Sequence, residues 1–170
     1  LKAWKTKVNR KPLILRGARQ IGKTTAVEIF AQDFENYIYL NLEREIDKSI
    51  FDEKFSVKEI FQAVLLNKNR ALSHGSTLLF IDEIQNSPTA IKMLRYFYEE
   101  LPQIYVIAAG SLLEVILEKE NLSFPVGRVE YLYMYPVTFE EFLQAQETQQ
   151  LVEMLNTCLL YTSPSPRDPH

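Results

Sequence analysis

A lysine and a threonine follow a glycine-rich segment at a spacing that suits phosphate binding. The segment Gly17-Ala-Arg-Gln-Ile-Gly-Lys-Thr24 reads G-x-x-x-x-G-K-T. Glycines allow backbone N–H groups to converge on phosphates, and the start of a following helix adds partial positive charge. At this spacing Lys23 reaches the β- and γ-phosphates, and the Thr24 hydroxyl ligates Mg²⁺. A plain strand–helix turn would need the glycines but not Lys23 and Thr24.

This segment, a Walker A motif, predicts a nucleotide-binding loop. The residues expected to bind the nucleotide are Gly17, Ala18, Arg19, Gln20, Ile21, Gly22, Lys23, Thr24 and Thr25. Contact through the backbone is sufficient for most of them. The side chains of Arg19 and Gln20 are expected to point away from the nucleotide.

An acidic pair, Asp82-Glu83, follows the apolar run Leu78-Leu-Phe-Ile81. This resembles a Walker B motif, in which a buried strand delivers a carboxylate to a metal. Asp82 is expected to hold Mg²⁺ through water, and Glu83 to deprotonate the attacking water as a general base. An acidic pair alone would favour a solvated strand end, but next to the phosphate loop the functional interpretation is favoured. A hydrolase needs a water-activating carboxylate, whereas a small-molecule kinase does not.

Alternating strands and helices must position these residues. Apolar runs predict strands at 11–16, 37–42, 77–81, 104–109 and 129–134. A helix is predicted over Thr24–Gln32, and the later helices begin at Ser56, Ser87, Ser111 and Thr138, each with a capping signal. Several strands are apolar on both faces, as a parallel sheet covered by helices on both sides requires. The predicted fold is a three-layer α/β sandwich.

Composition excludes several classes of protein. Of 170 residues, 46% are hydrophobic and 24% are charged, with a net charge of −3. This excludes a disordered, collagen-like or disulfide-rich secreted chain. The net charge gives nucleic-acid or membrane binding no support, and the longest apolar stretch, 104–117, is too short and too interrupted to span a bilayer. A single cysteine fits a reducing compartment, so a cytoplasmic location is expected.

The two ends of the chain differ from the middle. The chain begins with Leu1, so we expect the native N-terminus to be missing. Residues 158–170 contain three prolines and resemble translated adapter read-through; a native disordered tail is the alternative. The predicted organisation is therefore a core domain over 1–157 and a non-native or disordered tail over 158–170.

Together, five segments resemble the AAA-type (AAA+) ATPase domain of prokaryotic ATP-binding proteins that carry a C-terminal domain of unknown function. The segments are Lys11–Thr25, Phe80–Gln85, Ala109–Ser111, Gly127-Arg128 and Tyr135–Phe142. The resemblance extends from Leu1 to about Thr157. It implies a P-loop NTPase sandwich with a parallel sheet in the order 5-1-4-3-2, ATP and Mg²⁺ as cofactors, and a chain truncated before its lid.

The resemblance also implies two further catalytic residues. Ser111 follows the fourth strand, where such proteins place a polar sensor of the γ-phosphate, although it also suits an N-cap with Glu114. Arg128 precedes the fifth strand, where many of them place an arginine finger that acts on a neighbouring subunit. A homo-oligomer formed through Arg128 is thus implied, with a solvated arginine as the alternative.

The N-terminal segment leaves two alternatives open. Five basic residues surround Trp4: Lys2, Lys5, Lys7, Arg10 and Lys11. They form either a nucleic-acid contact or, more commonly, a solvated face. Trp4 is expected to pack either near the adenine of a bound nucleotide or in the core or an interface, and the second alternative is favoured.

The predicted function is ATP binding and Mg²⁺-dependent hydrolysis that couples nucleotide state to conformational change. The catalytic residues would be Lys23, Glu83, Arg128 and Ser111, with Thr24 and Asp82 at the metal. One alternative is a nucleotide-gated scaffold or signalling module without significant turnover. A second is a P-loop phosphotransferase acting on a small molecule.

Overall fold

The computed structural model describes residues 1–71, 75–111, 113, 123–138, 141–142 and 145. The chain divides into two compact units, Leu1–Tyr135 and Pro136–His170. The first unit contains the whole sheet. The second begins with the segment around Thr138, and the predicted tail over 158–170 lies outside the described residues.

Five parallel strands form one sheet. They are β1 (Leu13–Arg16), β2 (Asn36–Asn41), β3 (Thr77–Asp82), β4 (Ile104–Ala109) and β5 (Glu130–Tyr133). Their order is β2-β3-β4-β1-β5, with every neighbouring pair parallel. From the opposite edge this is 5-1-4-3-2, so the predicted order is confirmed. All five predicted strands are present; the bounds of β4 are as predicted, and those of the other four differ by one or two residues.

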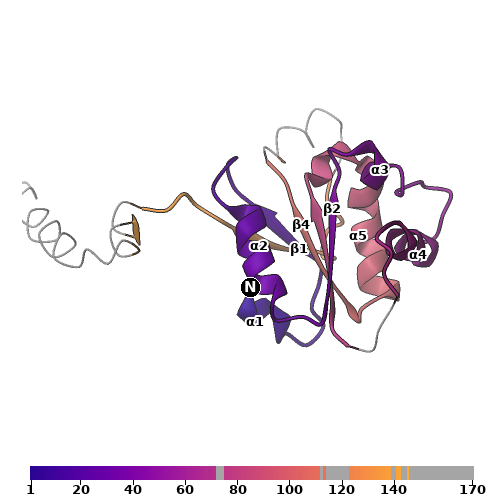
Figure 1. Ribbon diagram of the computed structural model, residues 1–170, viewed down its shortest axis with the longest axis horizontal. Coiled ribbons are helices and arrows are strands. Elements are labelled where there is room, and N and C mark those ends of the chain that lie inside the picture. Colours follow the sequence, from indigo (N-terminus) through magenta and orange to yellow (C-terminus); the bar gives the residue numbers. More distant parts are fainter. Residues whose placement is uncertain (72–74, 112, 114–122, 139–140, 143–144, 146–170) are drawn as a thin grey trace, which may run out of the picture. The chain divides into compact units, whose positions relative to one another are not determined.

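Helices cover both faces of this sheet, as predicted (Figure 1). On one face lie α1 (Lys2–Lys5) and α2 (Lys23–Ala31), and on the other lie α4 (Val57–Asn67) and α5 (Pro88–Glu100). The short elements α1, α3 (Glu45–Lys48) and the 3₁₀ turn η1 (Ile84–Asn86) were not predicted. One turn of helix is too short to show a hydrophobic period. Within the described residues, no helix has the length and apolar character needed to cross a membrane.

The interior strand β3, which lies between β2 and β4, is buried along its entire length. Its side chains alternate between two apolar clusters, with Leu79 and Ile81 in the cluster under α4 and α5, and Leu78 and Phe80 in the cluster under α2. This alternation follows from the two-residue period of a strand. A strand buried on both faces reads as an unbroken apolar run, which is why the sequence showed β3 clearly.

Side-chain caps fix two helix starts where they were predicted. The Ser56 hydroxyl accepts a hydrogen bond from the Glu59 amide at 3.3 Å, and the Glu59 carboxylate accepts one from the Ser56 amide at 2.8 Å. Ser87 caps α5 by accepting from the Ala90 amide at 3.2 Å, with Pro88 as the first helical residue. In the second unit, Thr138 and Glu141 form the same reciprocal pair as Ser56 and Glu59. The partner predicted for Ser111, Glu114, lies outside the described residues.

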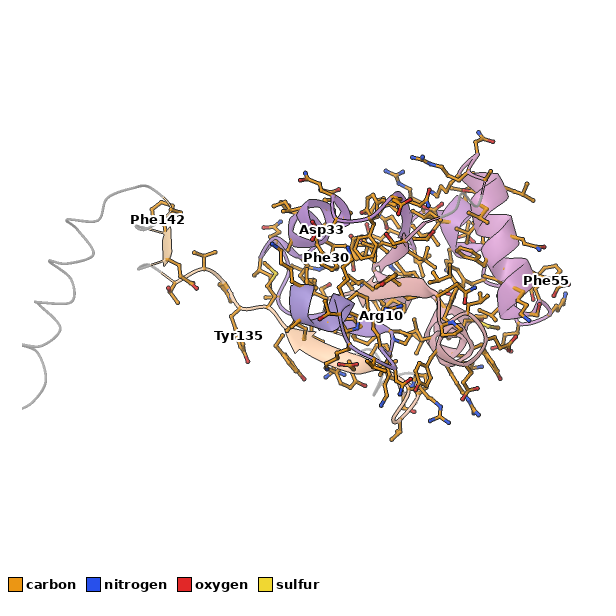
Figure 2. All side chains as sticks on the ribbon, turned by 90° about the horizontal axis from the view of Figure 1, so that it is seen from below. Arg10, Phe30, Asp33, Phe55, Tyr135 and Phe142 are labelled. Atoms are coloured by element: carbon orange, nitrogen blue, oxygen red, sulfur yellow. The ribbon has the colours of Figure 1, made fainter. Side chains whose placement is uncertain are left out.

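The N-terminal segment is bound to the first unit by its basic residues and Trp4. Trp4 is 5% exposed, and its Nε1 donates to the Lys11 carbonyl at 2.8 Å. Lys7 pairs with Glu130 at 2.5 Å, and the Arg10 guanidinium lies 3.4 Å from the centre of the Tyr105 ring (Figure 2). Trp4 is therefore a core residue.

Candidate nucleotide site

The glycine-rich loop connects β1 to α2 at the carboxyl edge of the sheet, where ligands of open α/β sheets bind. Gly17 has φ 147° and Gly22 has φ 87°, a region that other residues seldom adopt. A side chain at Gly17 would also overlap Ile21 and the Met134 carbonyl. Both glycines are therefore required by the loop conformation.

Lys23, the first residue of α2, is held against this loop. Its side chain is 8% exposed, and its Nζ donates to the carbonyls of Gly17 at 3.0 Å and Ala18 at 2.6 Å. The ammonium group thus lies inside the curve of the loop. This is the location from which it would meet phosphate oxygens.

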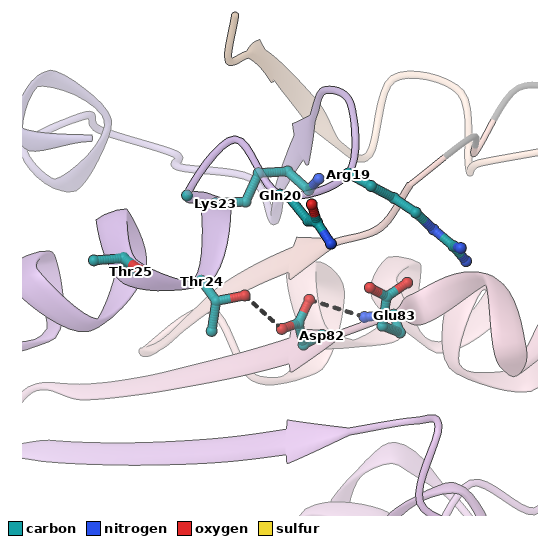
Figure 3. A pocket seen from close by; sticks show the side chains of 8 residues that line it. Arg19, Gln20, Lys23, Thr24, Thr25, Asp82 and Glu83 are labelled. Atoms are coloured by element: carbon teal, nitrogen blue, oxygen red, sulfur yellow. Dashed lines mark hydrogen bonds between the residues drawn. The ribbon is translucent and has the colours of Figure 1, made fainter. Parts of the chain in front are cut away.

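The carboxylate of Asp82, at the end of β3, receives hydrogen bonds from three directions. Thr24 Oγ1 donates to Oδ2 at 2.8 Å, and the amide of Glu83 donates to Oδ1 at 3.0 Å (Figure 3). The Tyr39 hydroxyl, from β2, donates to Oδ2 at 3.3 Å. Burial, reinforced by the negative charge of Asp82, raises the pKa of Tyr39 to about 12. Tyr39 therefore stays protonated at neutral pH and acts as a donor.

The Thr24–Asp82 pair has the chemistry of a magnesium site. Hydroxyl and carboxylate oxygens are ligands that Mg²⁺ accepts, and this ion usually completes its shell with water and substrate phosphates. Two such oxygens already in contact can share one small cation. In the described ranges, no three His, Cys, Asp or Glu side chains gather as a protein-only metal cage. The pair therefore fits a cation held jointly by the protein and a nucleotide.

Glu83 adopts an unusual backbone conformation, with φ 52° and ψ 45°. This left-handed conformation costs on the order of 1–3 kcal/mol for a residue other than glycine and is found most often at functional sites. It occurs where β3 ends and η1 begins. The carboxylate of Glu83 accepts a hydrogen bond from the side-chain amide of Gln85.

A cavity of about 400 Å³ lies between the loop and the end of β3. Its lining residues are Arg19, Gln20, Gly22, Lys23, Thr24, Thr25, Asp82 and Glu83 (Figure 3). The phosphate loop and the acidic pair, far apart in the sequence, are thus brought together. Gly17, Ala18 and Ile21 shape the loop without lining this cavity.

The side chains of Arg19 and Gln20 line the cavity and do not point away from it as expected. The Nε of Arg19 donates to Ser111 Oγ at 3.1 Å, and this contact draws the guanidinium across the loop. Gln20 has a positive φ of 61°, which turns the backbone at that point.

Ser111 lies two residues after the end of β4 and is 1% exposed. It lies at the carboxyl edge of the sheet, as predicted, but its contact is with Arg19 of the loop. Among the described residues, the cavity lining does not include Ser111.

Arg128 lies apart from the cavity of its own chain. Its Nε donates to Glu99 of α5 at 2.8 Å, and its guanidinium lies 5.9 Å from the centre of the Tyr98 ring. The Arg128 hydrogen bond is the largest influence that lowers the pKa of Glu99. Nothing in this environment places Arg128 near its own phosphate loop.

Two residues of the site were missed by sequence reasoning, Tyr39 and Gln85. The register of β2 on β3 pairs Asn41 with Asp82, which brings Tyr39 to the neighbourhood of the acidic pair. That register is not visible in the sequence. Gln85 follows the acidic pair closely, but its role depends on the backbone turn at Glu83.

The sheet order and the loop between β1 and α2 define a P-loop nucleotide-binding fold. The profile of the AAA domain family matches residues 9–143, so the chain belongs to this family. Membership supports a nucleotide-binding function of the ATPase type, and proteins of this kind generally use ATP and Mg²⁺.

Among solved structures, the chain is similar to the Orc1 protein of Aeropyrum pernix in complex with DNA. The identity is 17% and the TM-score is 0.44, with 90% of this chain and 46% of that chain covered. A likeness at this identity and score supports no statement about function. No curated protein matches the chain.

Proposed function

We propose that the domain binds ATP with Mg²⁺, hydrolyses it, and couples nucleotide state to a conformational change. The observation that carries this proposal is the Thr24–Asp82 hydrogen bond beside Lys23 and Glu83, all on one cavity. Lys23 and Thr24 begin α2, Asp82 ends β3, and Glu83 directly follows it.

Each side chain has a distinct role in this proposal. Lys23 and Arg19 supply positive charge to the phosphates. Thr24 and Asp82 hold the metal, and Tyr39 and the Glu83 amide hold the Asp82 carboxylate in place. When bound, Mg²⁺ would neutralise charge on the β- and γ-phosphate oxygens.

Glu83 is the proposed general base. Its carboxylate lines the cavity, so it can orient a water molecule and accept a proton from it. A scaffold without turnover would not need a carboxylate held there in a strained backbone conformation. A phosphotransferase would need an acceptor site and would have to exclude water from this carboxylate.

The Arg19–Ser111 hydrogen bond offers a way for a bound nucleotide to change the conformation of the segment after β4. Arg19 lines the cavity while bonded to a residue at the end of β4. When its guanidinium meets a γ-phosphate, that bond must shift or break, and the segment after β4 would respond. A lid and a C-terminal domain stay predictions from the family resemblance. A homo-oligomer and a cytoplasmic location are proposed with them, whereas the net charge of −3 gives a nucleic-acid partner no support.

The test is the substitution Glu83→Gln. The carboxamide keeps the shape but cannot take the proton, so ATP affinity should persist while phosphate release falls about 10²–10⁴-fold. Glu100→Gln, an exposed change on α5, is the matched control. Turnover at the wild-type level in Glu83→Gln contradicts the proposal. Binding without any wild-type turnover favours the scaffold, and ATP loss that requires an added acceptor favours the phosphotransferase.

A further inference from the structure

Gln85, in η1, lies two residues after the proposed base, Glu83. It is 7% exposed, and its Nε2 donates to Glu83 Oε2. A carboxylate can only accept hydrogen bonds, so the amide must present its NH₂ group to Glu83. The orientation of the Gln85 side chain is thereby defined.

The other end of this amide is not satisfied. In the part of the chain that the structure describes, Oε1 of Gln85 is buried without a hydrogen-bond partner. Burying a carbonyl without a partner costs free energy, and most buried polar atoms avoid it. An apolar side chain of the same length would fill this space without that cost. Packing alone therefore does not explain a glutamine at this position.

Gly110 provides the room for Gln85. It directly follows β4, and a side chain there would overlap Oε1 of Gln85 and the Leu113 side chain. Its φ is not positive, so the backbone conformation does not require glycine. The glycine is instead required by the space that Gln85 and Leu113 occupy.

We propose that Gln85 is a positioning residue that holds the Glu83 carboxylate toward the cavity. This inference rests on the proposed function of Glu83. A glutamate side chain has three rotatable bonds, and one buried donor restricts all of them. The left-handed backbone at Glu83 aims the side chain, and the Gln85 amide fixes its carboxylate. Together they orient the base before water is bound.

The substitution Gln85→Met tests this role because methionine has nearly the same shape but no donor. We expect kcat to fall about 10- to 100-fold, since small errors in the placement of a reacting group are costly. ATP affinity should stay unchanged, because the residues described as lining the cavity do not include Gln85. The melting temperature should not fall, because the unpaired carbonyl is removed. Gln62→Met, at an exposed position of α4, is the matched control.

Gly110→Ala gives a second approach to the same contact. The added methyl group displaces Gln85, so kcat should fall while ATP affinity persists. The double variant Gln85→Met/Gly110→Ala should lose less than the product of the two single losses, because both changes break one contact. If the kcat loss of the double variant equals the product of the two single losses, the two changes act independently and the inference is overturned.

Glu83→Gln is measured in the same assay to separate this inference from the proposed function. Loss of turnover in Glu83→Gln with a wild-type kcat in Gln85→Met overturns the role of Gln85 and leaves the base in place. A lower melting temperature and a raised KM in Gln85→Met, without a change in kcat, also overturn it. Wild-type turnover in Glu83→Gln overturns both. A kcat loss in Gln85→Met at unchanged ATP affinity and melting temperature supports the inference.

Discussion

The cavity beside the phosphate loop and the surface around Arg128 hold their charges in different ways. In the cavity, Lys23 and Asp82 are 8% and 6% exposed. Their partners come from the loop, α2, β2 and the residue that follows β3. The side chains of Arg128 and Glu99 are 44% and 30% exposed and pair with each other, and Glu99 also pairs with Arg95.

This difference indicates that the two regions hold charge in different ways: as buried, preorganised groups in the cavity and as an exposed ion pair around Arg128. Buried charges with several partners are preorganised, because their dipoles and hydrogen bonds do not rearrange when a ligand binds. An exposed ion pair contributes little to stability, so it can exchange one partner for another at low cost. The Arg128 guanidinium can therefore exchange Glu99 for another partner at low cost, whereas the Lys23 ammonium is held by the carbonyls of its own loop.

The largest effect is expected for the buried charge of the cavity, with the substitution Lys23→Ala. Removing the ammonium takes away the hydrogen bonds to phosphate oxygens, so the ATP affinity should fall at least about 100-fold and turnover should vanish. Calorimetry with Mg²⁺ present measures the affinity.

Lys58→Ala, an exposed change on α4, is the control and should bind ATP normally. An unchanged affinity in Lys23→Ala would mean that the loop is not a phosphate site. The contrast between the two regions would then lose its functional meaning.

The second-largest effect on turnover is expected for Arg128, the exposed charge that can exchange its partner. If it acts on the ATP of a neighbouring subunit, Arg128→Ala should lower turnover and leave ATP affinity nearly intact. Arginine fingers contribute about 10³–10⁵ in rate in other NTPases. Arg95→Ala is the matched control because Arg95 pairs with the same Glu99, at 3.0 Å, and it should leave turnover unchanged.

Two further measurements decide whether Arg128 acts across subunits. Turnover per subunit should rise with protein concentration. A mixture of Arg128→Ala and Glu83→Gln proteins should regain activity, because a subunit with Glu83 can use Arg128 of its neighbour. Turnover independent of concentration, without rescue in the mixture, would leave Arg128 as a surface ion pair.

The fold was largely predictable from the sequence. Apolar runs and capping signals located the strands and the longer helices, because a buried strand such as β3 and a capped helix such as α4 have local signatures. The order of the strands came from the family resemblance, since local patterns do not specify which strands pair. The one-turn elements α1 and α3 carry no such signature.

The candidate site was predictable only where its residues are contiguous. Lys23 and Thr24 follow their glycines directly, and Asp82 and Glu83 end one strand, so spacing alone indicated them. Tyr39 depends on the register between β2 and β3. Gln85 and Arg19 depend on a turn and on a contact with Ser111, neither of which spacing expresses.

The smallest effect is expected for the Arg128–Glu99 pair itself, and it should depend on pH. Hydrogen bonds from Arg128 and then Arg95 lower the pKa of Glu99 below its usual value of 4.5. A carboxylate with a lowered pKa in the folded state contributes stability above its unfolded pKa. That contribution is lost as the pH falls through the folded-state pKa.

Glu99→Gln should therefore lower the melting temperature slightly at pH 7, and this difference from wild type should shrink as the pH falls below 4.5 and through the lowered pKa of Glu99. The neighbouring change Glu100→Gln controls for loss of a charge on the same exposed helix end. ATP affinity should be unaffected, because Glu99 is not among the described residues that line the cavity. A deficit that persists unchanged in acid would show that Glu99 stabilises the fold by packing and not by its charge. The pair would then be a fixed structural feature, which would remove the basis for treating Arg128 as exchangeable.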